Sequence, residues 1–120
     1  MPARLSSFFL RSAFIVALVL IFVLAMIPQP VVPMVVDFQD KVEHCAAFAV
    51  LMLMGRAGWP TRAIRLGIGL ICYGVLIEVA QHTLTTNRIG DPLDVLADSV
   101  GVAIGLLLVR QVAIRRLAGG

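Results

Sequence analysis

The stretch of sequence that decides the fold is AFIVALVLIFVLAMI, residues 13–27, in which every side chain is apolar. The apolar segment extends back to residue 8, and within 8–27 only Arg11 and Ser12 interrupt it. Because a helix rises about 1.5 Å per residue, this segment is long enough to cross a hydrocarbon core of about 30 Å. No small-residue cleavage site follows it, and the chain continues with prolines instead. We therefore predict a retained transmembrane helix over 8–27 rather than a signal peptide.

The composition of the whole chain agrees with this prediction. Of its 120 residues 60% are hydrophobic and 14% charged, and the mean hydropathy is +0.99. Soluble domains carry roughly 25% charged residues, so this chain has too little polar surface to dissolve in water. The net charge of +3 comes from arginines that bracket the apolar segments, which indicates membrane topology and no nucleic-acid partner. Cys45 and Cys72 lack metal-binding spacing, and we expect both to be buried small hydrophobic residues.

Three further apolar segments follow the first, at 41–58, 63–84 and 92–109. The last begins with a strong helix-start signal: Asp91 suits the N-cap, Pro92 the first helical position and Asp94 the third. Short polar or turn-forming stretches separate the segments, and no linker is long enough to divide the chain. We predict an all-α fold, a single domain over 1–120 that forms an integral membrane bundle of four transmembrane helices.

The basic residues predict the orientation of the bundle, because Lys and Arg are retained on the cytoplasmic side. Eight of the ten basic residues fall at one end of the predicted helices, namely Arg4, Arg11, Arg56, Arg62, Arg65, Arg110, Arg115 and Arg116. The opposite end holds all seven acidic residues together with Lys41 and Arg88. Both termini are therefore expected in the cytoplasm, and the acidic end outside.

Helical spacing gathers the polar residues of the outer end onto three helix faces. The sets are Asp40, Lys41 and His44 on 41–58; Glu78, Gln81 and His82 on 63–84; and Asp91, Asp94 and Asp98 on 92–109. Ionisable side chains below the headgroups are costly and normally face the bundle interior with a partner, so we expect Arg88 to pair with Glu78 or an aspartate. The predicted binding residues, which would line one shared cavity, are Asp40, Lys41, His44, Glu78, Gln81, Arg88, Asp91, Asp94 and Asp98.

Purely structural roles are the alternative for several of these residues. Asp40 with Glu43, and Asp91 with Asp94, fit helix caps. Asp37 is expected to be a solvated charge in the proline-rich loop. The two histidines fit packing roles at the membrane interface. Glu78, Gln81 and Asp98 are harder to explain in this way, because they lie inside helices rather than at their starts.

Small residues predict close packing of the last helix. Gly101 and Gly105 form a GxxxG motif, and such residues let helix backbones approach closely in lipid. We expect this stripe to pack inside the bundle, with Gly67, Gly69 and Gly74 as facing positions. A homo-oligomer through Gly101 and Gly105 is the alternative.

Three motifs carry a resemblance to a known family. The chain reads DKVEH at 40–44, EVAQ at 78–81 and RIGDPLDVLADSVG at 88–101. In this order and spacing they resemble the VanZ-like family of bacterial membrane proteins, named for a protein associated with teicoplanin resistance. The family pattern has Asn where Asp98 stands and an aromatic residue where Cys45 stands. The resemblance implies a four-helix protein of the bacterial cytoplasmic (inner) membrane and a link to glycopeptide resistance.

Three functions remain open at this point. The first is binding or modification of an amphiphile headgroup, from a membrane lipid, a lipid-linked glycan or a lipoglycopeptide, by the outer polar cavity. The second is a membrane hydrolase or transferase with His44 or Glu78 as general base, in which Asp94 and Asp98 hold Mg²⁺ or Ca²⁺. The third is a small proton-coupled carrier acting as an oligomer. Whether the protein is an enzyme stays open, and no resident cofactor is expected.

Overall fold

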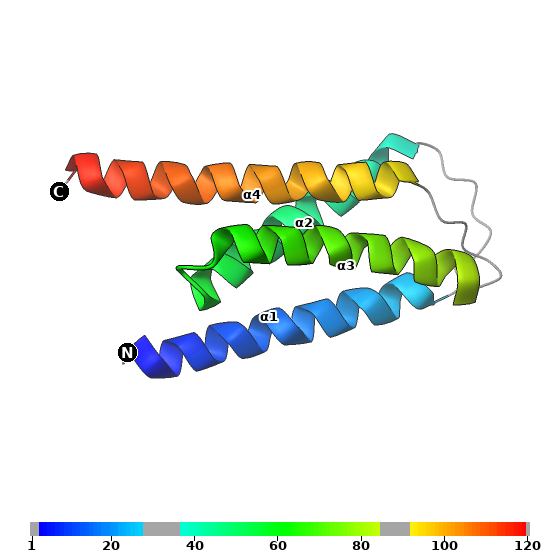
Figure 1. Ribbon diagram of the computed structural model, residues 1–120, viewed down its shortest axis with the longest axis horizontal. Helices are drawn as coiled ribbons and strands as arrows, with labels where there is room; N and C mark the ends of the chain where they lie inside the picture. Colours follow the sequence, from blue (N-terminus) through cyan, green and yellow to red (C-terminus); the bar gives the residue numbers. More distant parts are fainter. Residues whose placement is uncertain (1–2, 28–36, 85–91, 120) are drawn as a thin grey trace.

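The computed structural model describes residues 3–27, 37–84 and 92–119, and four α-helices account for nearly all of them (Figure 1). These helices are α1 (Ala3–Met26), α2 (Asp37–Gly58), α3 (Ala63–Leu84) and α4 (Pro92–Gly119). The prediction of an all-α fold is confirmed for the described residues. Three of the helices are long and apolar enough to cross a membrane: α1 over Ser7–Met26, α3 and α4.

α2 differs from the other three helices in its polarity. Its 22 residues are long enough to span a membrane, but they include Lys41, Glu43 and Arg56. The predicted count of four spans therefore stays a prediction, because among the described residues three helices combine the length and apolar composition of a span and α2 does not. The reason lies in the N-terminal half of α2, where polar side chains face α4 instead of adding to an apolar exterior.

The predicted helix boundaries are correct where the sequence has turn signals. Where it has none, the predicted helices are too short. α3 covers the predicted 63–84, and α4 begins at Pro92 as expected. α1 begins at Ala3 instead of residue 8, and α4 continues to Gly119 instead of ending at 109. Both extensions are polar or basic segments rich in Ala, Leu, Arg and Gln, which are good helix formers. Hydropathy alone underestimates such helices, because it detects the apolar span and not its polar continuation.

The start of α2 corrects two predictions. Asp37, expected in a loop, is the first residue of the helix. The predicted helix start at residue 41 is therefore four residues late. Asp40 lies one turn inside α2, so the prediction that it caps this helix is wrong.

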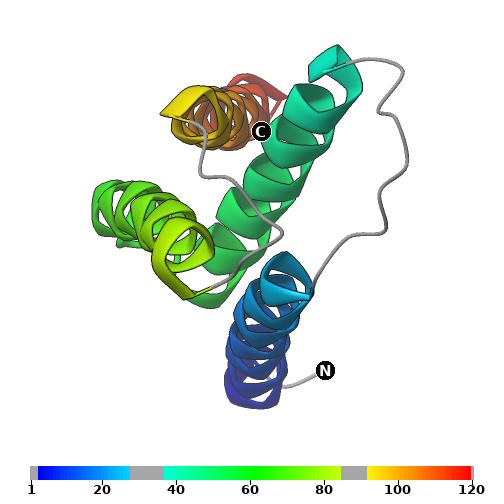
Figure 2. The same cartoon turned by 90° about the vertical axis from the view of Figure 1, so that its right-hand side faces the viewer.

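The contacts between helices define how they run. The contacts of α2 with α4 join Lys41 to Asp94 and His44 to Asp98, so the two helices are parallel. Both termini and the turn between α2 and α3 lie at one end of the molecule (Figure 1). Viewed along the bundle, α1 and α4 lie on opposite sides, and α2 crosses between them (Figure 2). α2 contacts all three other helices and packs most extensively on α4.

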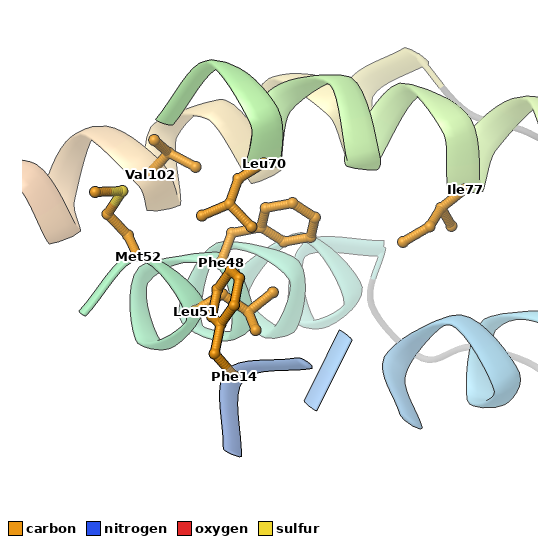
Figure 3. Packing of buried hydrophobic residues seen from close by; sticks show 7 residues of the cluster. All are labelled: Phe14, Phe48, Leu51, Met52, Leu70, Ile77 and Val102. Carbon is orange, nitrogen blue, oxygen red and sulfur yellow. The ribbon is translucent and has the colours of Figure 1, made fainter. Parts of the chain in front are cut away.

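The centre of the bundle is an apolar cluster to which every helix contributes. α2 supplies Phe48, Leu51 and Met52, all almost fully enclosed. The remaining members are Phe14 of α1, Leu70 and Ile77 of α3, and Val102 of α4 (Figure 3). This core occupies the middle of the molecule, so the polar residues of α2 and α4 lie beyond it, toward the end where both helices begin.

The outer surface is also apolar, as expected of a protein in lipid. Large hydrophobic side chains are exposed on each of the three candidate spans, for example Leu20 of α1, Ile68 of α3 and Leu107 of α4. Contiguous exposure of this kind is rare on soluble monomers. One prediction fails here: Cys72 is exposed on α3, whereas Cys45 is partly covered.

Candidate functional site

The site begins with a close approach between α2 and α4. A Cβ added at Gly101 would lie 3.0 Å from the carbonyl carbon of Cys45 and 3.1 Å from the backbone nitrogen of Ala49. A Cβ added at Gly105 would lie 2.7 Å from the Cβ of Met52. The GxxxG stripe therefore lets α4 approach the backbone of α2, and this face of α4 is covered within the chain.

That approach brings four charged or titratable side chains together, and we call Lys41, His44, Asp94 and Asp98 the polar cluster. The Nζ of Lys41 donates to Oδ1 of Asp94. Nδ1 of His44 lies 2.9 Å from Oδ1 of Asp98, and Nε2 of the same ring lies 3.8 Å from Oδ2 of Asp94. With Asp98 ionised, its carboxylate would only accept, and Nδ1 of His44 would donate in this contact.

Burial divides the polar cluster into two layers. Asp98 is 1% exposed and Asp94 6%, although both are acidic. The side chains of Lys41 and His44 are 22% and 24% exposed. A buried carboxylate is stable only when it is paired and hydrogen-bonded, which the two α2 residues achieve. The acids thus fix the orientation of Lys41 and His44, which form the accessible layer.

α3 closes the polar cluster from the other side. A Cβ at Gly74 would lie 2.7 Å from Oδ2 of Asp98, so only glycine leaves room for this carboxyl group. Gly67, which lies nearer the start of α3, packs on Val102 of α4. The expectation that Gly67 and Gly74 face α4 is correct, whereas Gly69 has open space beside it. The stripe of Gly101 and Gly105, in contrast, faces α2 and not these glycines.

Glu78 and Gln81 are buried on α3, as predicted. The three residues expected to share one face of this helix, Glu78, Gln81 and His82, nevertheless lie in different surroundings. Glu78 is 8% exposed, and its Oε1 atom is enclosed by protein. Gln81 turns toward α1, where its Nε2 donates to the carbonyl oxygen of Ala25 at 3.0 Å. His82 is exposed and does not share this environment. Gln81 therefore contributes a contact between α1 and α3.

Some predicted members cannot be placed. Arg88 and Asp91 lie outside the described residues, as does the side chain of Asp40. The predicted pairing of Arg88 and the capping role of Asp91 therefore stay predictions. Asp94, the other half of that predicted cap, lies in the first turn of α4 and binds Lys41.

The donor set of the polar cluster is also informative about metal binding. Among the described residues, no group of three His, Cys, Asp or Glu side chains is arranged to hold a metal ion. Asp94 and Asp98 instead accept bonds from Lys41 and His44. As described, the cluster offers hydrogen-bond donors next to acceptors, with one imidazole held between two carboxylates.

The opposite end of the molecule, which we call the arginine end, contains contacts that the sequence did not predict. Nε of Arg11 donates to the carbonyl oxygen of Gly58 at 2.8 Å, and its guanidinium lies 5.2 Å from the centre of the Trp59 ring. Phe14 packs edge-on against the same ring at 5.5 Å. Arg11 thereby satisfies a carbonyl at the C-terminus of α2, where cations are favourable.

Two hollows lie at the arginine end. The first, of about 380 Å³, runs between α1 and α3 and is mainly apolar, with Leu18, Leu66 and Leu70 among its lining residues. The second, of about 580 Å³, surrounds the start of α3 and includes Arg56. Arg62 and Arg65 line both. At the acidic end, where the sequence predicted a shared cavity, the side chains of the polar cluster pair with one another.

The fold and the polar cluster together define a helical protein with three candidate membrane spans and a buried charge network at one end. Comparison with protein-family models, with curated proteins and with solved structures gives no match. The function is therefore inferred from the residues and their geometry.

Proposed function

We propose that the chain is a VanZ-like integral membrane protein with four spanning helices and both termini in the cytoplasm of a bacterium. Three helices are long and apolar enough to span, and α2 crosses between them with Lys41 and His44 paired to Asp94 and Asp98 of α4. The termini lie at the end that carries the arginines, which is the retained side under the positive-inside rule. α2 then spans the membrane as an inner helix, despite its charges.

Labelling of single cysteines tests this topology. In a chain with Cys45 and Cys72 replaced by alanine, we expect Asp37→Cys and Arg62→Cys to react with a membrane-impermeant maleimide from opposite sides. Asp37 begins α2, and Arg62 lies in the turn that follows that helix. Reaction of both cysteines from the same side would overturn the four-span topology.

We further propose that the polar cluster binds the polar headgroup of an amphiphile at the outer membrane surface. The observation that carries this proposal is the division of burial: Lys41 and His44 are partly exposed, and buried carboxylates hold both in place. Side chains fixed by a surrounding layer bind with less loss of conformational freedom. Donors beside carboxylate acceptors suit a hydroxyl-rich headgroup, such as a lipid-linked glycan or the sugar part of a lipoglycopeptide.

Native mass spectrometry of the protein extracted from its membrane tests this function. We expect a co-purifying lipid-linked species on the wild type, and a decrease of about tenfold in its affinity, worth 1.4 kcal/mol, in Lys41→Gln and His44→Ala. The matched control is His82→Ala, which removes an exposed histidine of α3. Equal adducts on the wild type and on folded Lys41→Gln and His44→Ala would contradict the proposal.

The link to glycopeptides has its own test. Expression in a teicoplanin-susceptible bacterium is expected to raise the inhibitory concentration of teicoplanin, and the His44→Ala variant to return it to the level of the empty vector. The His82→Ala variant should behave like the wild type. If the inhibitory concentration does not change although the wild-type protein is present in the membrane, the link to resistance is contradicted. This outcome does not bear on headgroup binding, which mass spectrometry tests separately.

A second candidate function is hydrolysis or group transfer with His44 as general base. The specific observation is the contact of Nδ1 with Asp98, which orients the ring as a carboxylate does beside a catalytic histidine. Glu78, the other candidate base, is more deeply buried than His44. In this case the co-purifying lipid would be turned over by the wild type, whereas His44→Gln would bind it without turnover. If the wild type binds the lipid without turning it over, the enzymatic function is contradicted and only the binding function is supported.

A further inference from the structure

We infer that the arginine end holds a second ligand, an anionic phospholipid whose phosphate lies beside Arg62 and Arg65 and whose acyl chain fills the groove between α1 and α3. This site lies at the opposite end of the bundle from the polar cluster. It requires only that the protein sits in a membrane, and it does not depend on the amphiphile proposed above.

The shape of the two hollows supports a molecule with a charged head and an apolar chain. Their volumes, about 380 and 580 Å³, lie within the range of small-molecule sites. The apolar groove is lined by Phe14 and Leu18 of α1 and by Leu66 and Leu70 of α3. The basic hollow adjoins it through Arg62 and Arg65, which line both. An apolar groove that shares two arginines with a basic hollow fits a phospholipid better than a free phosphate or a simple hydrocarbon.

The charge of this end selects an anionic headgroup. Arg62 and Arg65 are exposed, and Arg56 lines the same basic hollow. The seven acidic residues of the chain all lie between positions 37 and 43, at 78, or between 91 and 98, away from the turn that carries these arginines. Basic pockets between membrane helices bind anionic lipid headgroups. Charge complementarity therefore favours an anionic lipid over a zwitterionic one.

Contacts outside the apolar core connect the helices that border the groove. Trp59 lies at its rim, with the Arg11 guanidinium over the ring and Phe14 against it. At the other end of the groove, the hydroxyl of Tyr73 donates to the carbonyl oxygen of Leu18 and ties α3 to α1. Gly69 lines the wall, and a Cβ there would meet nothing within 4 Å. The missing side chain leaves space for an acyl chain.

Trp59 provides the test, because it is the only tryptophan in the chain and it lines the groove. The protein is placed in phosphatidylcholine nanodiscs with a tenth of phosphatidylglycerol, in which either the glycerol lipid or an equal share of the choline lipid carries bromine at acyl carbons 6 and 7. Bromine quenches tryptophan only on close approach. We expect on the order of tenfold enrichment of the brominated anionic lipid at Trp59, because each arginine near the surface adds to anionic lipid binding.

Two kinds of variant separate the head from the chain. Arg62→Gln with Arg65→Gln should reduce quenching by the anionic lipid to the level of the choline lipid. The matched control, Arg110→Gln with Arg115→Gln, removes two exposed arginines of α4 and should leave the enrichment intact. Gly69→Leu keeps every charge but fills the groove, and should also abolish the enrichment. Equal quenching by both brominated lipids in the wild type would overturn the proposal, as would full enrichment in Gly69→Leu.

Discussion

The two ends of the bundle treat their charges in opposite ways. At the end that carries the polar cluster, Lys41 and His44 of α2 bind buried carboxylates of α4, so these side chains hold two helices together. At the arginine end, Arg11 binds a backbone carbonyl and an aromatic ring, and Arg62 and Arg65 remain exposed. The difference teaches that charge in this small protein has two uses, one in the specific pairing of helices and the other in contact with the surroundings.

Loss of a buried acid of the polar cluster should give the largest decrease in unfolding free energy. Asp98→Ala removes the partner of His44 and leaves a gap beside Gly74, and breaking such a buried pair costs about 3 kcal/mol of unfolding free energy. Asp98→Asn keeps the volume and an acceptor, so we expect a cost of about 1 kcal/mol. Titration with a denaturing detergent in mixed micelles measures both values. Equal costs for the two variants would contradict this prediction, because the volume and the acceptor that asparagine retains would then contribute nothing.

The next largest effect should come from the glycine that permits the approach of α2 and α4. Gly101→Ala places a Cβ against the backbone of Cys45 and Ala49, and overpacking of this kind costs about 2 kcal/mol. The matched control is Gly69→Ala, which has open space beside it and exchanges glycine for a better helix former. The same detergent titration should separate the two variants. A Gly101→Ala protein as stable as Gly69→Ala would contradict the close approach.

A smaller effect is expected midway between the two ends. Tyr73→Phe removes the hydroxyl that donates to Leu18, and the loss of one hydrogen bond costs about 1 kcal/mol. The ring itself, which lies 6.1 Å from that of Phe48, would stay in place. Thermal unfolding in detergent checks this prediction, with Cys72→Ala, an exposed position of α3, as the control. No difference between the two would mean that α1 is held without this bond.

The smallest effect should come from the arginine end. Arg11→Gln removes an exposed cation from the Trp59 ring, where such contacts contribute about 0.5 kcal/mol. Trp59 fluorescence should shift in this variant but not in the control Arg110→Gln, because the Arg11 guanidinium lies over the ring and Arg110 lies on α4. A loss of stability as large as that of Asp98→Ala would erase the contrast between the two ends.

Much of the fold could be predicted from local sequence signals. The apolar segments located four helices, and the start of α4 followed from Asp91, Pro92 and Asp94 because helix-start chemistry is local. The extension of α2 back to Asp37 was missed, since a proline-rich segment precedes it and polar residues gave no hydropathy signal. Three of the four helices have the length and apolar composition of a span, and α2 lacks that composition because of its polar residues.

The sequence predicted which residues form the candidate site better than it predicted the contacts between them. His44 and Asp98 lie together because helical spacing and chain topology bring polar residues of successive helices to one end. The contact of Gln81 with Ala25, however, depends on the rotation of α3 against α1, which spacing within one helix does not determine. The direction of Gly101 was missed for a similar reason: a stripe of small residues indicates a close neighbour but does not say which helix it is.

The long separation between the partners of the polar cluster has a consequence for biosynthesis. Lys41 and Asp94 are 53 positions apart, and His44 and Asp98 are 54 apart. While the ribosome makes α2 and α3, the charges of α2 have not yet met their counterparts. Under the proposed four-span topology, we expect α2 to pass from the translocon into the bilayer only after α4 has emerged, so that a nascent chain arrested before residue 94 retains α2 in an aqueous environment.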